Sequence, residues 1–182
     1  MRIAVTLALT LAACTGGGHV DPADRDHVAS GSVSPATTGP VYVVWVSDDG
    51  SGDYAYLYGS GSSDGSSFVV GLDDPVPTAA TFNGSFGVGQ PFLAPDSYHP
   101  AQGRVADADT AAFDAAFKGF AGNYAFIFRG NINATDIPWL GAFPMGVSCG
   151  KCTAEGGFEP VACDQMEMIV APTDQLPACP WT

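Results

Sequence analysis

Residues 41–58 read VYVVWVSDDGSGDYAYLY, and this stretch decides the fold class. The run at 41–47 is rich in β-branched and aromatic residues, and a second such run follows at 53–58 after a turn of Asp, Gly and Ser. Two runs of this kind, joined by a short Gly- and Asp-rich segment, are typical of a β-hairpin. The prediction of an all-β domain starts from this hairpin.

Further runs of the same kind follow along the chain. A turn at 59–66 leads to a strand predicted at 67–72, and the strand predicted at 123–129 has the clearest alternation, with Tyr124, Phe126 and Phe128 on one face. The other predicted strands cover residues 81–88, 91–94, 139–147 and 165–170. A set of roughly six to nine short strands predicts a single β-sandwich or a partly open barrel.

One segment departs from the β pattern. Residues 108–118 (ADTAAFDAAFK) are rich in alanine, and Phe113 and Phe117 lie four positions apart, on one face of a helix. Gly119 follows the segment, and glycine commonly ends helices. The sequence therefore predicts one short helix near 108–118, with its two phenylalanines packed against one end of the β-domain.

The first fourteen residues carry an export pattern. Arg2 supplies one positive charge, and the apolar run that follows is shorter than the about 20 helical residues needed to cross a bilayer. The run ends at Leu11-Ala12-Ala13-Cys14, which resembles the lipobox of bacterial lipoprotein precursors. The alternative is an ordinary secretory signal in which the cysteine has no role.

The resemblance implies that residues 1–13 are a cleaved signal peptide and that Cys14 carries the lipid. Two or more acyl chains give stable membrane anchoring. Thr15 stands where lipoproteins retained at the inner membrane usually have Asp, so the resemblance implies a lipid anchor in the bacterial cell envelope, at the outer membrane of a Gram-negative cell.

The mature chain is predicted to have two parts. Residues 14–40 are rich in Gly, Ser, Thr, Pro and Asp and show no apolar period, which predicts a lipidated N-terminus followed by a disordered tether. Residues 41–182 are long enough for one domain with its own core.

The charge of the chain argues against nucleic acid as a partner. The sequence has six Lys and Arg residues and 19 Asp and Glu residues, and loss of Arg2 with the signal leaves a net charge of −14. A surface of this sign repels phosphates and anionic lipid headgroups. The expected link to the membrane is therefore the N-terminal lipid, and a protein or carbohydrate ligand is the remaining kind of partner.

Four cysteines remain once Cys14 is assigned to lipid: Cys149, Cys152, Cys163 and Cys179. In an exported protein an even number predicts two disulfides, here with three connectivities open. A four-cysteine zinc site would need a second close pair, and a redox C-x2-C pair would need a helix after it. Neither pattern is present in the sequence, so disulfides are the expectation.

The sequence offers no convincing catalytic set. The pattern G-x-S-x-G at 146–150 contains Ser148, but a hydrolase of that type has a histidine later in the chain, and every histidine here comes earlier. His99 is the only histidine after residue 40, in a segment bounded by Pro95 and Pro100 that predicts a surface loop. We expect no catalytic residues and a protein that is not an enzyme.

One acidic turn suggests a ligand. Asp48, Asp49 and Asp53 lie within the turn of the first hairpin, and carboxylates on a flexible loop are typical calcium ligands, although a plain turn also explains them. No other cofactor is expected.

The main expectation is a non-catalytic lipoprotein with a structural or interaction-mediating β-domain. The alternative is a calcium-assisted carbohydrate- or ligand-binding module, with the sugar stacked on Trp45, Tyr54, Tyr56, Tyr58 or Trp139.

Overall fold

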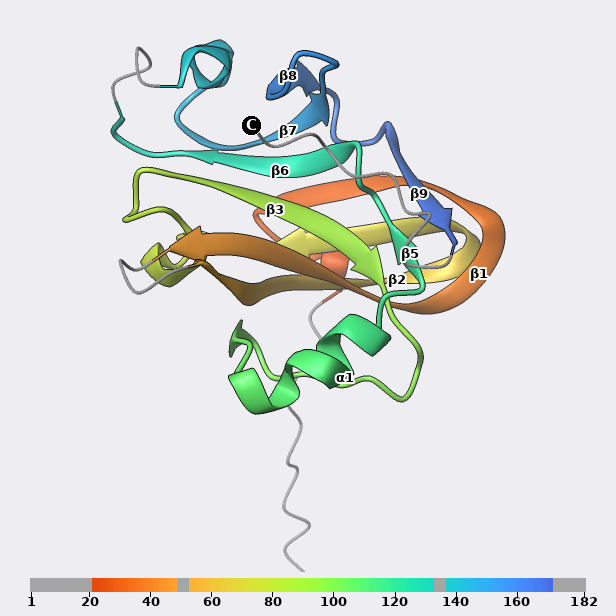
Figure 1. Cartoon of the computed structure of the whole chain (residues 1–182). Coiled ribbons are helices and arrows are strands. Elements are labelled where there is room, and N and C mark those ends of the chain that lie inside the picture. Colours follow the sequence, from red (N-terminus) through yellow and green to blue (C-terminus); the bar gives the residue numbers. More distant parts are fainter. Residues whose placement is uncertain (1–20, 49–52, 133–136, 172–182) are drawn as a thin grey trace, which may run out of the picture.

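The computed structural model describes residues 21–48, 53–132 and 137–171, and in this part of the chain nine strands form one sheet (Figure 1). The strands are β1 (His27–Asp48), β2 (Asp53–Leu72), β3 (Phe86–Leu93), β4 (Gly103–Arg104), β5 (Gly119–Phe120), β6 (Tyr124–Arg129), β7 (Gly146–Cys152), β8 (Phe158–Val161) and β9 (Met166–Val170). The helices are η1 (Pro22–Asp24), η2 (Thr78–Ala80), η3 (Asp107–Asp109), α1 (Thr110–Ala115) and η4 (Pro138–Ala142). The all-β prediction is confirmed.

Most of the sheet is built on one long hairpin. β1 and β2 pair antiparallel from His27 opposite Leu72 to Asp48 opposite Asp53. Two predictions are therefore wrong. Residues 27–40 belong to strand β1 and not to a disordered tether, and residues 59–66 belong to strand β2 and not to a turn between two strands.

The alternation of β1 was hidden in the sequence because its inward residues are small. Ala29 and Val33 are buried, while Ser32 and Ser34 between and after them are exposed. Gly31 faces the neighbouring strand so closely that an added Cβ would lie 1.8 Å from the carbonyl oxygen of Met166. A strand with small inward residues and serines outward lacks the apolar period that predicts strands.

Four strands close into a barrel. The first half of β1 pairs in parallel with β9, and its second half pairs antiparallel with β3. The two-residue strand β5 then joins β3 to β9 and completes the ring. Figure 1 shows β1 curving around one side of the molecule to make both sets of contacts. The closed ring explains why β1 is long, since one strand serves two sides of the barrel.

Three groups of buried side chains form the core. The first contains the inward side chains of β1, β2, β6 and β9 around Trp45, which is fully buried and donates its indole N–H to the carbonyl oxygen of Tyr58 at 2.8 Å. The second lies on the opposite face of β6, with Ile127 and Phe143. The third lies between the sheet and α1, around Phe92. β6 is therefore covered on both faces, and Figure 1 shows it between the barrel and the β7–β8 segment.

The predicted helix is present and shorter than expected. It begins as η3 at Asp107 and ends with α1 at Ala115. Phe113 and Phe117 both contact Phe92, with ring centroids 5.7 Å and 4.4 Å from it. The prediction that both phenylalanines pack against the β-domain is confirmed. No helix in the described ranges is long and apolar enough to cross a bilayer.

Two other boundaries differ from the predictions. In place of two strands predicted at 81–88 and 91–94, the structure has one strand, β3, at Phe86–Leu93. The chain turns just before Phe86, with Asn83 in the left-handed region (φ 51°), so β3 starts later than predicted. The strand predicted at 139–147 is helix η4 followed by β7. Pro138 starts η4, a position that proline favours because its missing N–H is not needed there.

Candidate functional site

A groove with a volume of about 670 Å³ lies over the middle of the β1–β2 hairpin, and we call it the hairpin groove. Thr38, Pro40 and Tyr42 of β1 line it together with Ser60 and Ser62 of β2. Tyr42 is opposite Ser60 and Pro40 is opposite Ser62, so these residues share one face of the hairpin. One face of a two-stranded segment therefore presents a row of hydroxyl groups.

The glycines of β2 explain why this face carries the polar side chains. β2 bends back on itself, and an added Cβ at Gly61 would lie 1.9 Å from the carbonyl oxygen of Val69. At Gly59, which has a φ of 112°, an added Cβ would lie 2.9 Å from the side chain of Val43. Since side chains alternate along a strand, glycine at these inward positions leaves Ser60 and Ser62 on the groove side.

Two further segments complete the hairpin groove. Asp96 and His99 line it from the loop after β3, and Arg25 lines it from the segment before β1. The loop is attached to the hairpin by Tyr42, whose hydroxyl donates to the carbonyl oxygen of Tyr98 at 2.9 Å. Burial raises the pKa of the Tyr42 hydroxyl above its usual value of 10.0, so this group stays protonated and remains a donor.

An ion pair and two other polar contacts attach residues around the start of β1 to residues just after β2. Arg25 pairs with Asp73, and Nε2 of His27 lies 2.9 Å from a carboxylate oxygen of Asp74. Asp26 accepts a hydrogen bond from the backbone N–H of Asp74 at 2.9 Å. These contacts hold Arg25 at the groove and balance its charge with that of a neighbouring carboxylate.

The polar side chains of the groove differ in what they bind within the protein. Ser63 is buried, and its hydroxyl oxygen lies 2.8 and 3.0 Å from the backbone carbonyl oxygens of Thr37 and Ser67, either of which can accept its one proton. Within residues 21–48, 53–132 and 137–171, no hydrogen bond or ion pair engages the side chains at the groove positions Thr38, Ser60, Ser62, Asp96 and His99. These five keep their hydrogen-bonding capacity for a ligand.

The structure confirms that His99 lies in an exposed loop, and His99 also lines a second cavity of about 330 Å³. The carboxylates that share these cavities with it are Asp96 from the loop and Asp109 from η3. Ser148 lies on β7, which leads into another strand and not into a helix, so the local geometry of a hydrolase nucleophile is missing.

The residues of the predicted calcium site are only partly described. Asp48 and Asp53 face each other at the ends of β1 and β2, whereas Asp49 lies outside the described residues. In the part of the chain that the structure describes, no group of three His, Cys, Asp or Glu side chains is placed to hold a metal ion. Calcium binding stays a prediction. A rise in the thermal midpoint on adding calcium, reversed by a chelator, would support it, and an unchanged midpoint would remove it.

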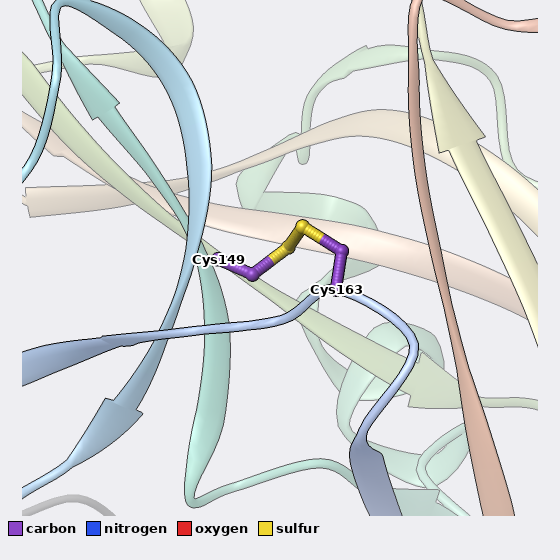
Figure 2. The surroundings of a disulfide bond; sticks show 2 residues. All are labelled: Cys149 and Cys163. Carbon is purple, nitrogen blue, oxygen red and sulfur yellow. A yellow bond between two sulfur atoms is a disulfide. The ribbon is translucent and has the colours of Figure 1, made fainter.

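The described cysteines are all disulfide-bonded. Cys149 of β7 is linked to Cys163, fourteen residues later, with their Cα atoms 5.2 Å apart (Figure 2). Cys152 is disulfide-bonded as well, and Cys179 lies outside the described residues. The link joins β7 to the segment between β8 and β9, so it connects one edge of the sheet to the barrel.

The aromatic residues proposed for sugar stacking serve the fold. Trp45 is 0% exposed, and Trp139 packs against Phe143 and Phe158. Tyr54, Tyr56 and Tyr58 alternate along β2, but Tyr56 and Tyr58 pack against the first core group and the Tyr54 ring lies 4.2 Å below the Arg104 guanidinium. An exposed row of Tyr54, Tyr56 and Tyr58 would have supported sugar stacking, and the three side chains are instead partly buried.

Sequence reasoning missed the hairpin groove, which contains no residue of the proposed calcium or stacking sites. The available signal was the alternation GSGSS at 59–63, where glycine and serine take opposite faces of a strand.

Cys14, the predicted lipidation site, lies outside the described residues. The chain matches no family model, and comparison with curated proteins and with solved structures finds no match. The fold and cysteines define a disulfide-bonded all-β protein.

Proposed function

We propose that this chain is an exported bacterial lipoprotein that presents a non-catalytic, disulfide-stabilised β-domain at the cell envelope, with a structural or interaction-mediating role. Lipid on Cys14 supplies the membrane link, and the outer membrane is the expected location in a Gram-negative cell. The domain is expected to meet its partner, a protein or a carbohydrate, at that surface.

The state of the cysteines is the observation that carries this proposal. Cys149, Cys152 and Cys163 are disulfide-bonded. Disulfides persist in oxidising compartments outside the cytoplasm and are rare within it, which agrees with the export pattern at the N-terminus. With Cys149 and Cys163 paired, we infer that Cys152 pairs with Cys179, since Cys14 is assigned to lipid.

Replacement of Cys14 tests the anchor. The full-length chain and its Cys14→Ser variant are expressed in a bacterial host with radiolabelled palmitate, and envelope fractions are separated. The unmodified chain is expected to take up label and to sediment with membranes, and the variant to lose both properties because serine has no thiol to modify. Thr15→Ser, at the adjacent position, should behave as the unmodified chain. Equal labelling of the Cys14→Ser variant, or no labelling of either, would refute the proposal.

A further inference from the structure

We propose that the hairpin groove is a binding site for a neutral carbohydrate chain. The proposal rests on Thr38, Tyr42, Ser60, Ser62, Asp96 and His99, which the structure brings to one surface from two strands and a loop. It does not depend on lipidation of Cys14, so it can fail or succeed independently of the proposed function.

The chemistry of the lining groups selects a ligand with many hydroxyls. Serine and threonine hydroxyls both donate and accept, the Asp96 carboxylate accepts from two donors, and the imidazole of His99 can do either. Sugar hydroxyls also donate and accept, and neighbouring hydroxyls on a sugar ring can bind both oxygens of one carboxylate. The groove side chains that make no hydrogen bond or ion pair within the described residues therefore offer the donors and acceptors that a saccharide needs.

Other ligand classes fit less well. An extended peptide that joins a sheet needs unpaired backbone groups, but the groove lies over paired strands, with Tyr42 opposite Ser60 and Pro40 opposite Ser62. An anion would meet Asp96 and a chain with a formal net charge of −13, while the positive charge of Arg25 is already paired with Asp73. A neutral, polar ligand avoids both costs.

The groove also has the size and rigidity of a binding site. Its volume of about 670 Å³ is within the range of about 300–1,000 Å³ typical of sites for small ligands. Its floor is fixed by the close approach of Gly61 to Val69, and its loop is held by the bond from Tyr42 to Tyr98. A site that is already ordered loses less conformational freedom on binding, which favours affinity. The Pro40 side chain adds an apolar surface for the C–H face of a sugar ring, beside the Tyr42 ring that packs against Phe92 and Tyr98.

The experiment is an NMR titration of the full mature chain with neutral trisaccharides: cellotriose, maltotriose, mannotriose and triacetylchitotriose. The chain is kept in a zwitterionic detergent, because detergents with sugar headgroups would compete for the groove. At least one trisaccharide is expected to shift the backbone amide signals of the groove residues at 38–39, 41–42, 60–62 and 96–99. Shifts confined to other parts of the chain, or none with any trisaccharide at millimolar concentration, would overturn the proposal.

Matched variants test which side chains bind. Ser62→Val and Asp96→Ala together remove a hydroxyl and a carboxylate from exposed groove positions. We expect the double variant to bind at least about tenfold more weakly, because it loses hydrogen bonds from one neutral and one charged group. Ser32→Val and Asp107→Ala make the same changes at exposed positions outside the groove and should leave the affinity unchanged. Equal effects of the two pairs would overturn the proposal. Should the groove variant fail to fold, the amide shifts of the unmodified chain decide.

Discussion

At the scale of single residues, tyrosine hydroxyls tie segments of this domain together. The Tyr58 hydroxyl donates to the carbonyl oxygen of Asp73 at 2.8 Å, and that of Tyr54 donates to the carbonyl oxygen of Ala79 at 2.8 Å. The Tyr42 hydroxyl holds the loop that contains His99. Each tyrosine joins a strand to a segment that follows it, so these hydroxyls position loops that the sheet itself does not hold.

We expect the free energy of unfolding to fall in alkali as the Tyr58 hydroxyl ionises. Burial raises the pKa of the Tyr58 hydroxyl above 10.0, and the negative charge of Asp73 raises it further. The Tyr58 hydroxyl therefore makes its full contribution to stability below pH 10, and this contribution is lost as the pH rises through the higher pKa of the folded state. We expect Tyr58→Phe to lower the free energy of unfolding by about 1 kcal/mol at pH 7 and to reduce the alkaline decline, in urea titrations from pH 7 to pH 11.

Tyr54→Phe is the control for this prediction, since it removes an equivalent hydrogen bond at an exposed position and keeps Tyr58. It should retain the alkaline decline of the unmodified chain. We expect Tyr58→Phe to reduce the alkaline decline without abolishing it, because burial also raises the pKa of Tyr42 and Tyr98 and these groups contribute to the decline. An identical decline with and without the Tyr58 hydroxyl would contradict the prediction.

At the scale of elements, α1 is held to the sheet by its phenylalanines. Phe113 is 8% exposed and contacts Phe92 and Phe117 edge to face. We expect Phe113→Ala to lower the free energy of unfolding by about 3 kcal/mol, because it removes a buried ring and leaves a cavity. Ala112→Ser, at an exposed neighbouring position, should change it little. Chemical denaturation measures both variants, and equal stabilities would show that α1 does not contribute to the core.

The disulfide between β7 and the segment before β9 is a second element-scale contact. Cys149→Ala with Cys163→Ala opens a link that spans fourteen residues, and we expect a loss of about 3 kcal/mol in the free energy of unfolding. The buried position of Cys149 adds to the loss. Denaturation in the absence of reductant checks it, with Ser148→Ala as the neighbouring control. A double variant as stable as the control would mean that the link is not formed or not stabilising.

Sequence patterns predicted the strands with large inward side chains and missed those with small ones. β6 was predicted within one residue, because Tyr124 and Phe126 alternate with residues that face a second core group. The sequence instead predicts a tether over residues 27–34 of β1 and a turn over residues 59–63 of β2, since Gly31 and Gly61 occupy inward positions at close backbone contacts. Glycine indicates a turn by local preference, whereas here long-range packing requires it.

The hairpin groove is not predicted by the sequence, for a related reason. The sequence predicts disulfide-bonded cysteines from export and their even number, and the prolines that flank His99 predict a surface loop. To predict the hairpin groove, one would need to know that Tyr42 lies opposite Ser60 and that the loop containing Tyr98, 56 residues later, contacts Tyr42. Register and loop packing of this kind depend on three-dimensional contacts that no local pattern in the sequence records.

At the scale of the whole molecule, the first described element lies close in sequence to the predicted anchor. η1 starts at Pro22, only eight residues after Cys14. Even a fully extended chain from Cys14 to Pro22 spans at most about 28 Å, at about 3.5 Å per residue. A lipid-anchored domain would therefore stay near the membrane surface, which favours a ligand at that surface, and Pro22 itself lines the hairpin groove.

The most direct test of the account is mass spectrometry of the native protein, with and without reductant. We predict a mature chain that begins at Cys14 and carries the mass of its acyl groups. We also predict a gain of two hydrogens for each of two disulfides on reduction, with Cys149–Cys163 and Cys152–Cys179 as the linked peptides. A chain that retains Met1 without lipid, or that has free thiols at these four cysteines, would contradict the account.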